Sequence, residues 1–209
     1  MGWVVVSRGV RGPYAKSAEV RRRILDACTE AFAETGFYGA VMKDIASRAG
    51  ISLTGLLHHF PHKEDLLLAV LEFRAEQGRE LLAQAGALDP AGEPVRALRG
   101  MLTVAADNTA YPGLIELHCV MSGEAASPSH PAHGYYTDRF GKLRLFYTAA
   151  FTALAEEGRL RSAVPPEVLA TMTLSLLNGL QTQWLYDRGV DVAEGLRAFL
   201  VSVVPALAE

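Results

Sequence analysis

Histidine and cysteine are the residues of this 209-residue chain that could hold a metal or act in nucleophilic catalysis. The six histidines fall into two stretches, His58, His59 and His62, and then His118, His130 and His133. A structural metal site needs about four nitrogen, sulfur or carboxylate ligands at a compact spacing. Pro61 breaks the helical register between His58 and His62, and no cysteine or carboxylate completes a compact site. We therefore expect no metal.

The residues around Cys119 do not favour an enzyme either. His118 and Cys119 are neighbours in sequence, and helix neighbours point apart, so they are not a catalytic pair. Ser122-Gly123-Glu124 lacks the strand and turn of a nucleophile elbow, and the chain has no glycine-rich phosphate loop. Cys28 is interpreted as a small core residue. We expect no catalytic residue and no cofactor.

Charge is distributed unevenly along the chain, although the formal net charge is only −3. Residues 1–63 carry nine lysines and arginines against five acids, whereas the remaining residues carry eleven against eighteen. A basic segment on an acidic body suggests that this segment meets a polyanion. A solvated basic face would give the same counts, so charge alone leaves both interpretations open.

The pattern from Met42 to Phe60 adds a structural reason for binding nucleic acid. Two short helical segments are joined at Gly50-Ile51-Ser52, which is the pattern of a helix-turn-helix. Gly50 accepts the backbone angles of a tight turn, and Ser52 can cap the second segment. That segment could lie in a DNA major groove, although spacing alone leaves an ordinary helical corner as the alternative.

Length and composition limit the number of domains and the class of protein to which the chain can belong. A chain of this length forms one domain, or a small module fused to a larger one. Half of the residues are apolar and 21% are charged, so the chain is not of the disordered class. The apolar stretch 168–185 is interrupted by polar residues and favours a buried helix over a membrane span. With two cysteines and no recognisable targeting segment, we expect a soluble, cytoplasmic protein.

Apolar residues recur at helical spacing through most of the chain, and no convincing alternating strand is present. In the first segment Ser17 is the expected N-cap and Gly36 the expected end. The helices expected are 17–36, 42–49, 52–59, 63–85, 94–108, 114–121, 135–157, 166–186 and 191–204, with a loop at 122–134. We predict an all-α fold of about nine helices.

The run from Arg21 to Leu71 resembles the TetR family of bacterial transcription regulators. The matching residues are Ile24, Ala27, Phe32, Gly36, Phe37, Asp44-Ile45-Ala46, Ala49-Gly50, Ser52, Leu56, His59-Phe60, Lys63-Glu64 and Leu66. The resemblance implies an N-terminal arm and helix-turn-helix DNA-binding domain over residues 1–62. It also implies a ligand-binding and dimerisation domain over residues 63–209.

The same resemblance implies a mechanism. Two heads of a homodimer would read adjacent major grooves of a palindromic operator in double-stranded DNA. A small molecule of unknown identity would bind in the body, move the heads apart and relieve repression. Carried over by position, the DNA contacts fall on Ser52, Leu53, Thr54, Gly55, His58 and His59. Contacts to phosphate are expected from Lys43, Lys63, Tyr38, Arg8, Arg11 and Lys16.

Two positions depart from the family pattern. The family usually has a tyrosine that contacts phosphate where this chain has Leu57. It also tends to have threonine or serine where Ala40-Val41 stand, and neither of these side chains can cap a helix. These changes put individual contacts in doubt. They also keep a second function open, namely a helical small-molecule-binding protein with a weakened or inactive DNA-binding head.

The body is less informative about its ligand. A pocket among helices should be apolar with a few polar anchors. The candidates to line it are Leu102, Tyr111, Glu116, His118, Cys119, Met121, Tyr147, Phe151, Met172, Leu176, Asn178 and Gln181. Each of these could instead be a core residue, and the amides of Asn178 and Gln181 could find their partner in a second subunit.

The last two helices carry more apolar surface than one helix pair needs. We predict that they form a four-helix bundle across a two-fold axis, although packing within one chain is the alternative. The residues expected at this interface are Leu177, Leu180, Trp184, Leu196, Phe199, Leu200 and Val203.

Overall fold

The computed structural model describes the backbone of residues 13–208 and the side chains of residues 17–208. Within this range the chain forms nine α-helices, one 3-10 helix and no strand, which confirms the predicted all-α class. The helices are α1 (Pro13–Gly39), α2 (Met42–Arg48), α3 (Leu53–His59), α4 (Lys63–Gln84), α5 (Pro94–Thr109), α6 (Pro112–Glu124), α7 (His133–Glu156), α8 (Pro166–Tyr186) and α9 (Val192–Val203), followed by the 3-10 helix η1 (Pro205–Leu207).

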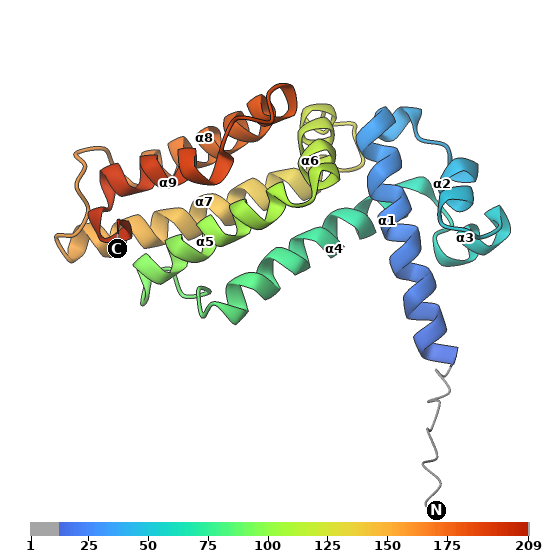
Figure 1. The fold of residues 1–209 in the computed structure, drawn as a ribbon, viewed down its shortest axis with the longest axis horizontal. Helices are drawn as coiled ribbons and strands as arrows, with labels where there is room; N and C mark the ends of the chain where they lie inside the picture. Colours follow the sequence, from blue (N-terminus) through green and yellow to red (C-terminus); the bar gives the residue numbers. More distant parts are fainter. Residues whose placement is uncertain (1–12, 209) are drawn as a thin grey trace, which may run out of the picture.

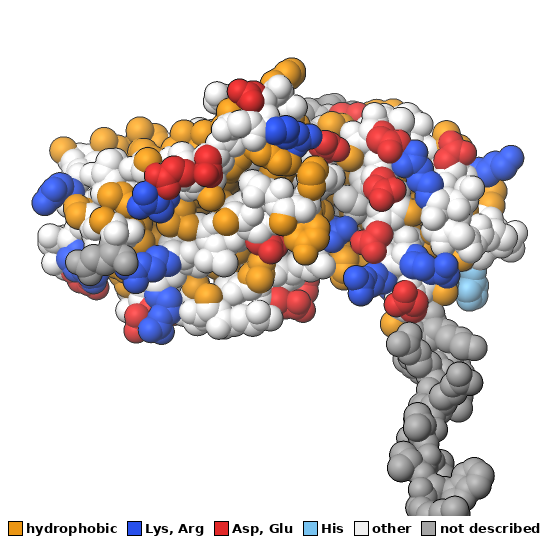
Figure 2. Space-filling view, viewed as in Figure 1, with side chains coloured by type: hydrophobic (Ala, Val, Ile, Leu, Met, Phe, Trp, Pro, Cys, Tyr) orange, Lys and Arg blue, Asp and Glu red, His pale blue; other side chains and the backbone are white. Residues whose placement is uncertain are grey.

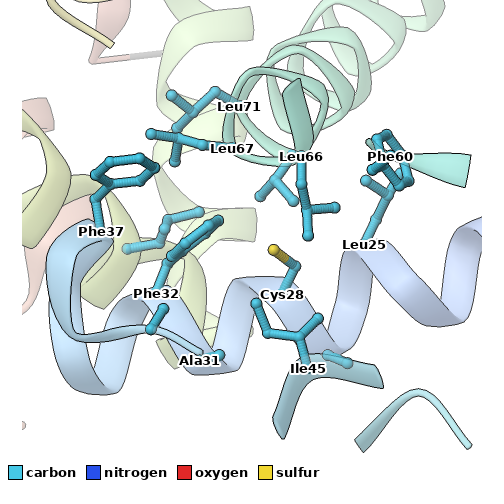
Figure 3. Close-up of a cluster of buried hydrophobic side chains, with 14 of the residues drawn as sticks. Leu25, Cys28, Ala31, Phe32, Phe37, Ile45, Phe60, Leu66, Leu67 and Leu71 are labelled. Atoms are coloured by element: carbon cyan, nitrogen blue, oxygen red, sulfur yellow. The ribbon is translucent and has the colours of Figure 1, made fainter. Parts of the chain in front are cut away.

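Helix α1 crosses the start of α4, and α2 and α3 pack beside it to form a small head (Figure 1). The predicted apolar stripe of α1 points into this head, where Cys28 and Phe32 are fully buried. Figure 3 shows Cys28 between Ile45 of α2 and Leu66 of α4, and Phe32 on the side of α1 that faces Leu67 of α4. The core that holds the helix-turn-helix is therefore built partly from the first turns of α4.

Helices α5, α7, α8 and α9 lie side by side in an elongated body, with α4 along one flank (Figure 1). Tyr147 and Phe151 of α7 are fully buried in its core, among leucines of α5, α8 and α9. Helix α6 lies at the end of the body nearest the head and packs against α1. No helix among residues 13–208 has the length and hydropathy needed to cross a membrane.

Proline explains two differences between the predicted and the observed helix starts. Helix α1 begins at Pro13, four residues before the predicted cap Ser17, because proline is favoured in the first turn. Helix α6 likewise begins at Pro112 and extends to Glu124. The predicted loop at 122–134 is therefore shorter, since only residues 125–132 lie between α6 and α7.

Candidate nucleic-acid interface and effector cavity

The turn between α2 and α3 is built by Gly50, which has φ +67°. The N–H of Gly50 donates to the carbonyl of Ser47 at 3.1 Å, and that of Ile51 donates to Ala46 at 3.0 Å. These two bonds close α2 as a Schellman motif. Ser52 then caps α3, because its hydroxyl accepts a hydrogen bond from the N–H of Gly55 at 3.0 Å. Both roles follow from the residue types.

Helix α3 packs against the head through one apolar side, and its other side is exposed to solvent. Leu56 is fully buried against α1 and α2. The exposed positions are Ser52, Leu53, Thr54, Leu57 and His58, and Gly55 and His59 are partly exposed. In Figure 2 histidine lies at the edge of the head where Figure 1 draws α3. The six residues predicted to contact DNA through this helix are therefore all at least partly accessible.

The five predicted phosphate contacts near α2 and in the arm differ in their surroundings. Lys43 is exposed in the first turn of α2, whose N-cap Val41 makes no side-chain capping bond. Tyr38 is 68% exposed, but its ring packs edge-on against His130, with 5.6 Å between centroids. Arg8, Arg11 and the side chain of Lys16 lie outside the described part of the chain.

Lys63 has a structural partner that the sequence did not indicate. Its Nζ donates to the carbonyl oxygen of Ala40 at 3.0 Å and lies 4.6 Å from the centre of the Phe37 ring. The side chain thus ties the start of α4 to the segment between α1 and α2. A lysine ammonium has three donors, so this bond leaves two for a phosphate.

A carboxylate from the body enters the head at Gly36. Glu124, at the end of α6, accepts a hydrogen bond from the N–H of Phe37 at 2.8 Å. Gly36 has φ +69° and ψ 179°, a region that only glycine adopts readily. A Cβ on Gly36 would lie 2.0 Å from Glu124 Oε1. His130 is buried, and its Nε2 lies 3.5 Å from Glu124 Oε2. Head and body are therefore joined by a specific polar contact.

The body contains a cavity of about 110 Å³ between α4, α5, α6, α7 and α8. Its lining is mostly apolar, with aromatic side chains from α7. The polar residues that line it are Arg74, Asn108, His118, Tyr135, Tyr136, Arg139, Asn178 and Gln181. This volume is below the roughly 300–1,000 Å³ of sites for drug-sized ligands, so the cavity fits a small molecule.

Of the twelve residues predicted to bind a ligand, His118, Asn178 and Gln181 line this cavity. The other nine lie outside the lining of this cavity. Met121, Tyr147 and Phe151 are fully buried in the two cores, and Tyr111 and Met172 are exposed on the surface. Glu116 pairs with Arg188 at 3.0 Å. Leu102, Leu176 and Cys119 are partly buried, with Cys119 Sγ 3.8 Å from the Thr182 hydroxyl.

His118 and Asn178 form a polar pair on the cavity wall. His118 Nε2 donates to Asn178 Oδ1 at 3.1 Å. Burial, and to a smaller extent the positive charge of Arg139, lower the pKa of His118 to about 4, although the bond to Asn178 acts in the opposite direction. His118 is therefore neutral at pH 7.

Two arginines in the cavity were missed by the sequence reasoning. Arg74 follows Val70 and Leu71 at helical spacing, and Arg139 lies between Tyr136 and Leu143 on the inner face of α7. A charge placed on the apolar stripe of a helix was the available signal. The Nη groups of Arg74 donate to Gln77 at 2.8 Å and to Asp26 of α1 at 3.1 Å.

The seven residues predicted for the dimer interface divide into two groups. Leu196 and Leu200 are fully buried in the core of this chain, and Trp184 is nearly so beneath Arg188. These three residues pack within this chain, and their place at a subunit interface remains a prediction. Leu177, Leu180, Phe199 and Val203 are only half-buried. Figure 2 shows apolar side chains along the edge formed by α8 and α9.

Comparisons with known proteins agree with this arrangement. The family model for bacterial regulatory proteins of the tetR family matches residues 24–70. The HTH-type transcriptional repressor AcnR of Corynebacterium efficiens is 28% identical over 164 residues, covering 78% of this chain and 81% of AcnR. The HTH-type transcriptional repressor BepR of Brucella suis is 25% identical over 195 residues, covering 88% of this chain and 89% of BepR.

A solved structure of SmeT, a repressor from Stenotrophomonas maltophilia, also has a similar fold. In its complex with triclosan the TM-score is 0.72 at 19% identity, and the match covers 88% of this chain and 91% of SmeT. The family match lies on the helix-turn-helix and the start of α4, and the structural match extends over the body.

Proposed function

We propose that this chain, whose residues 24–70 match the model for bacterial regulatory proteins of the tetR family, is a repressor that a small molecule releases from a palindromic operator. It is a DNA-binding transcription regulator with a ligand-binding body. The observation that carries the proposal is the capped α3, which buries Leu56 and exposes Thr54 and His58 on one side. A helix that is fixed on one side by Leu56 and presents Ser52, Thr54 and His58 on the other suits a major groove.

The proposed division of labour places DNA binding in residues 1–62 and ligand binding with dimerisation in residues 63–209. Two connections support transmission between these parts. The first turns of α4 belong to the head core through Leu66 and Leu67. Glu124 of α6 holds the backbone of Phe37, and α6 also lines the cavity through His118. A ligand that displaces α4 or α6 would therefore move the head.

Dimerisation is proposed through α8 and α9. Leu177, Leu180, Phe199 and Val203 leave a partly exposed apolar strip on these helices. A second copy related by a two-fold axis would cover the same strip on both subunits. Repression itself is supported by AcnR and BepR, which are both named repressors, and effector binding is supported by the triclosan complex of SmeT.

Salt dependence of DNA binding tests the proposal. We expect the affinity of the full chain for duplex DNA, measured by fluorescence anisotropy, to fall linearly on a log–log plot against salt. The slope should be about −0.9 for each phosphate neutralised. Lys43→Ala should make this slope shallower by about one. Arg161→Ala, which removes an exposed charge in the segment between α7 and α8, is the matched control and should leave the slope unchanged.

The same measurement separates the alternative function. An affinity that is undetectable, or that does not respond to salt, would refute DNA binding. It would favour a helical ligand-binding protein with an inactive head. An equal loss in Lys43→Ala and Arg161→Ala would refute the assignment of phosphate binding to the head.

A further inference from the structure

The charge of the cavity is one-sided. Arg74 and Arg139 are the charged residues that line it, and its lining includes no aspartate or glutamate among the described residues. His118 adds no charge, because it is neutral at pH 7. Positive charge in a partly enclosed, mostly apolar space is unfavourable unless an anion accompanies it. Asp26 pairs with Arg74 at 3.1 Å, so Arg139 is the charged residue of this lining that has no ion-pair partner within 4.0 Å among residues 17–208.

Arg139 is the less engaged of the two arginines. Arg139 also lines an outer groove, together with Glu72, Glu76 and Asp138. None of the ion pairs within 4.0 Å among residues 17–208 includes Arg139. A guanidinium presents five N–H donors in a planar fork that matches a carboxylate. Arg139 can thus turn this fork to an anion in the cavity.

The hydrogen-bond donors of Arg74 are only partly satisfied within the protein. Its Nη groups are bonded to Asp26, Thr29 and Gln77, but its Nε is buried and has no hydrogen-bond partner among the described residues. A buried donor without a partner is costly and therefore uncommon in folded proteins. An acceptor placed in the cavity beside Arg74 could satisfy this group. The two arginines thus provide a charged end, and Phe140, Leu143 and Leu177 provide an apolar wall.

We propose that the effector is a small organic anion, specifically a carboxylate with a short apolar or aromatic group, held by Arg139 and Arg74. This inference rests on the proposed function, since it assumes that the cavity is the effector site. A cationic effector would meet two guanidinium groups and no carboxylate. The cavity volume of about 110 Å³ limits the molecule to a small one.

Arg74 also explains how such an anion is sensed. Its Nη2 donates to Asp26 Oδ1 at 3.1 Å, and Asp26 belongs to α1 of the head. A carboxylate in the cavity competes with Asp26 for the same guanidinium. Binding therefore weakens a contact between α4 and the head and favours a different position of α1.

Matched probes of one shape and different charge test the proposal. The panel is benzoate with benzamide and benzylamine, and hexanoate with hexanamide and hexylamine. Melting temperature and calorimetric affinity are measured on the full chain at pH 7.5 and fixed salt, without DNA. We expect at least one carboxylate to raise the melting temperature and its amide and amine to have little effect. In Arg139→Gln the affinity for that carboxylate should fall tenfold or more.

Arg144→Gln is the control, because Arg144 lies on α7 as an exposed residue outside the cavity lining. It should bind the carboxylate like the parent protein. The proposal is overturned if no carboxylate stabilises the protein more than its amide. It is equally overturned if benzylamine or hexylamine binds as well, or if Arg144→Gln loses as much affinity as Arg139→Gln.

Two further measurements, of stability without ligand and of affinity for DNA, separate a structural role of Arg139 from ligand binding and ligand binding from DNA release. Without ligand, Arg139→Gln should be as stable as the parent protein or more stable, because it removes an unpaired charge. A marked loss of stability would assign Arg139 a structural role and contradict the proposal. A separate measurement of DNA affinity tests the proposed function. If a carboxylate binds but leaves the affinity for DNA unchanged, release of DNA by the effector is refuted, whereas the proposal that the cavity binds carboxylates is not.

Discussion

Glu124→Ala should loosen the contact between head and body by a predictable amount. The change deletes the carboxylate that accepts the Phe37 N–H at 2.8 Å. A hydrogen bond to a charged group contributes about 1.5–3 kcal/mol to the free energy of unfolding. For a chain of this size, that loss corresponds to a melting temperature lower by about 3–12 °C.

Gly36→Ala tests the same contact from the other side. An alanine with φ +69° and ψ 179° costs about 1–3 kcal/mol in backbone strain alone. Its Cβ would also displace Glu124, whose Oε1 lies 2.0 Å from that position. In a Glu124→Ala background only the strain remains. The two substitutions together should therefore cost about 1–2 kcal/mol less than the sum of the single changes, which is a coupling of neighbouring sites.

Urea unfolding of the two single variants and the double variant measures this coupling. Protein concentration must be the same in all samples, because subunit dissociation contributes to the apparent stability of a dimer. Gly123→Ala is the control, since its Cβ would meet no atom within 4 Å and the residue lies in α6. It should be neutral or stabilising by up to about 1 kcal/mol. Strictly additive costs, or an unaffected Glu124→Ala protein, would refute the reasoning.

Three other predictions follow from the geometry. Lys63→Ala should weaken binding to all duplexes alike and reduce the salt slope by about one, whereas Thr54→Ala should relax base preference at one position by about 1–3 kcal/mol. The opposite pattern in a binding assay would exchange their roles. The pKa of His118 is lowered to about 4 in the folded state, so the unfolded chain binds a proton first as pH falls through 6.5. Between pH 6.5 and 4 the free energy of unfolding, measured with urea, should therefore fall by about 3 kcal/mol more in the parent protein than in His118→Gln. The same pH dependence in both proteins would contradict this. Phe199→Asp should shift the protein toward monomer in analytical ultracentrifugation, and an unchanged dimer would exclude α9 from the interface.

The helix-turn-helix was predictable because its determinants are local. Gly50 sets the turn, Ser52 caps α3 and Leu56 follows at the spacing that buries it. The roles of Gly50 and Ser52 depend on residues no more than a few positions away. The start of α1 was missed because Ser17 and Pro13 are both good first-turn residues, and sequence alone does not rank them.

The cavity was harder to predict because five helices form it. Tyr147 and Phe151 have the spacing and character of pocket residues, yet the packing of α5, α8 and α9 buries them completely. The local pattern around Arg139 did contain information, since an arginine on an apolar helical face needs a reason. The hydrogen bond from Lys63 to Ala40 could not be predicted from the local sequence, because it depends on how α4 meets the end of α1.

Selection from random duplex DNA by the purified full chain at moderate salt tests the central claim most directly. The account predicts enrichment of one palindrome whose half-sites lie about one helical turn apart, bound through α3 of two subunits. A pool without an enriched sequence, or an enriched site without two-fold symmetry, would contradict it.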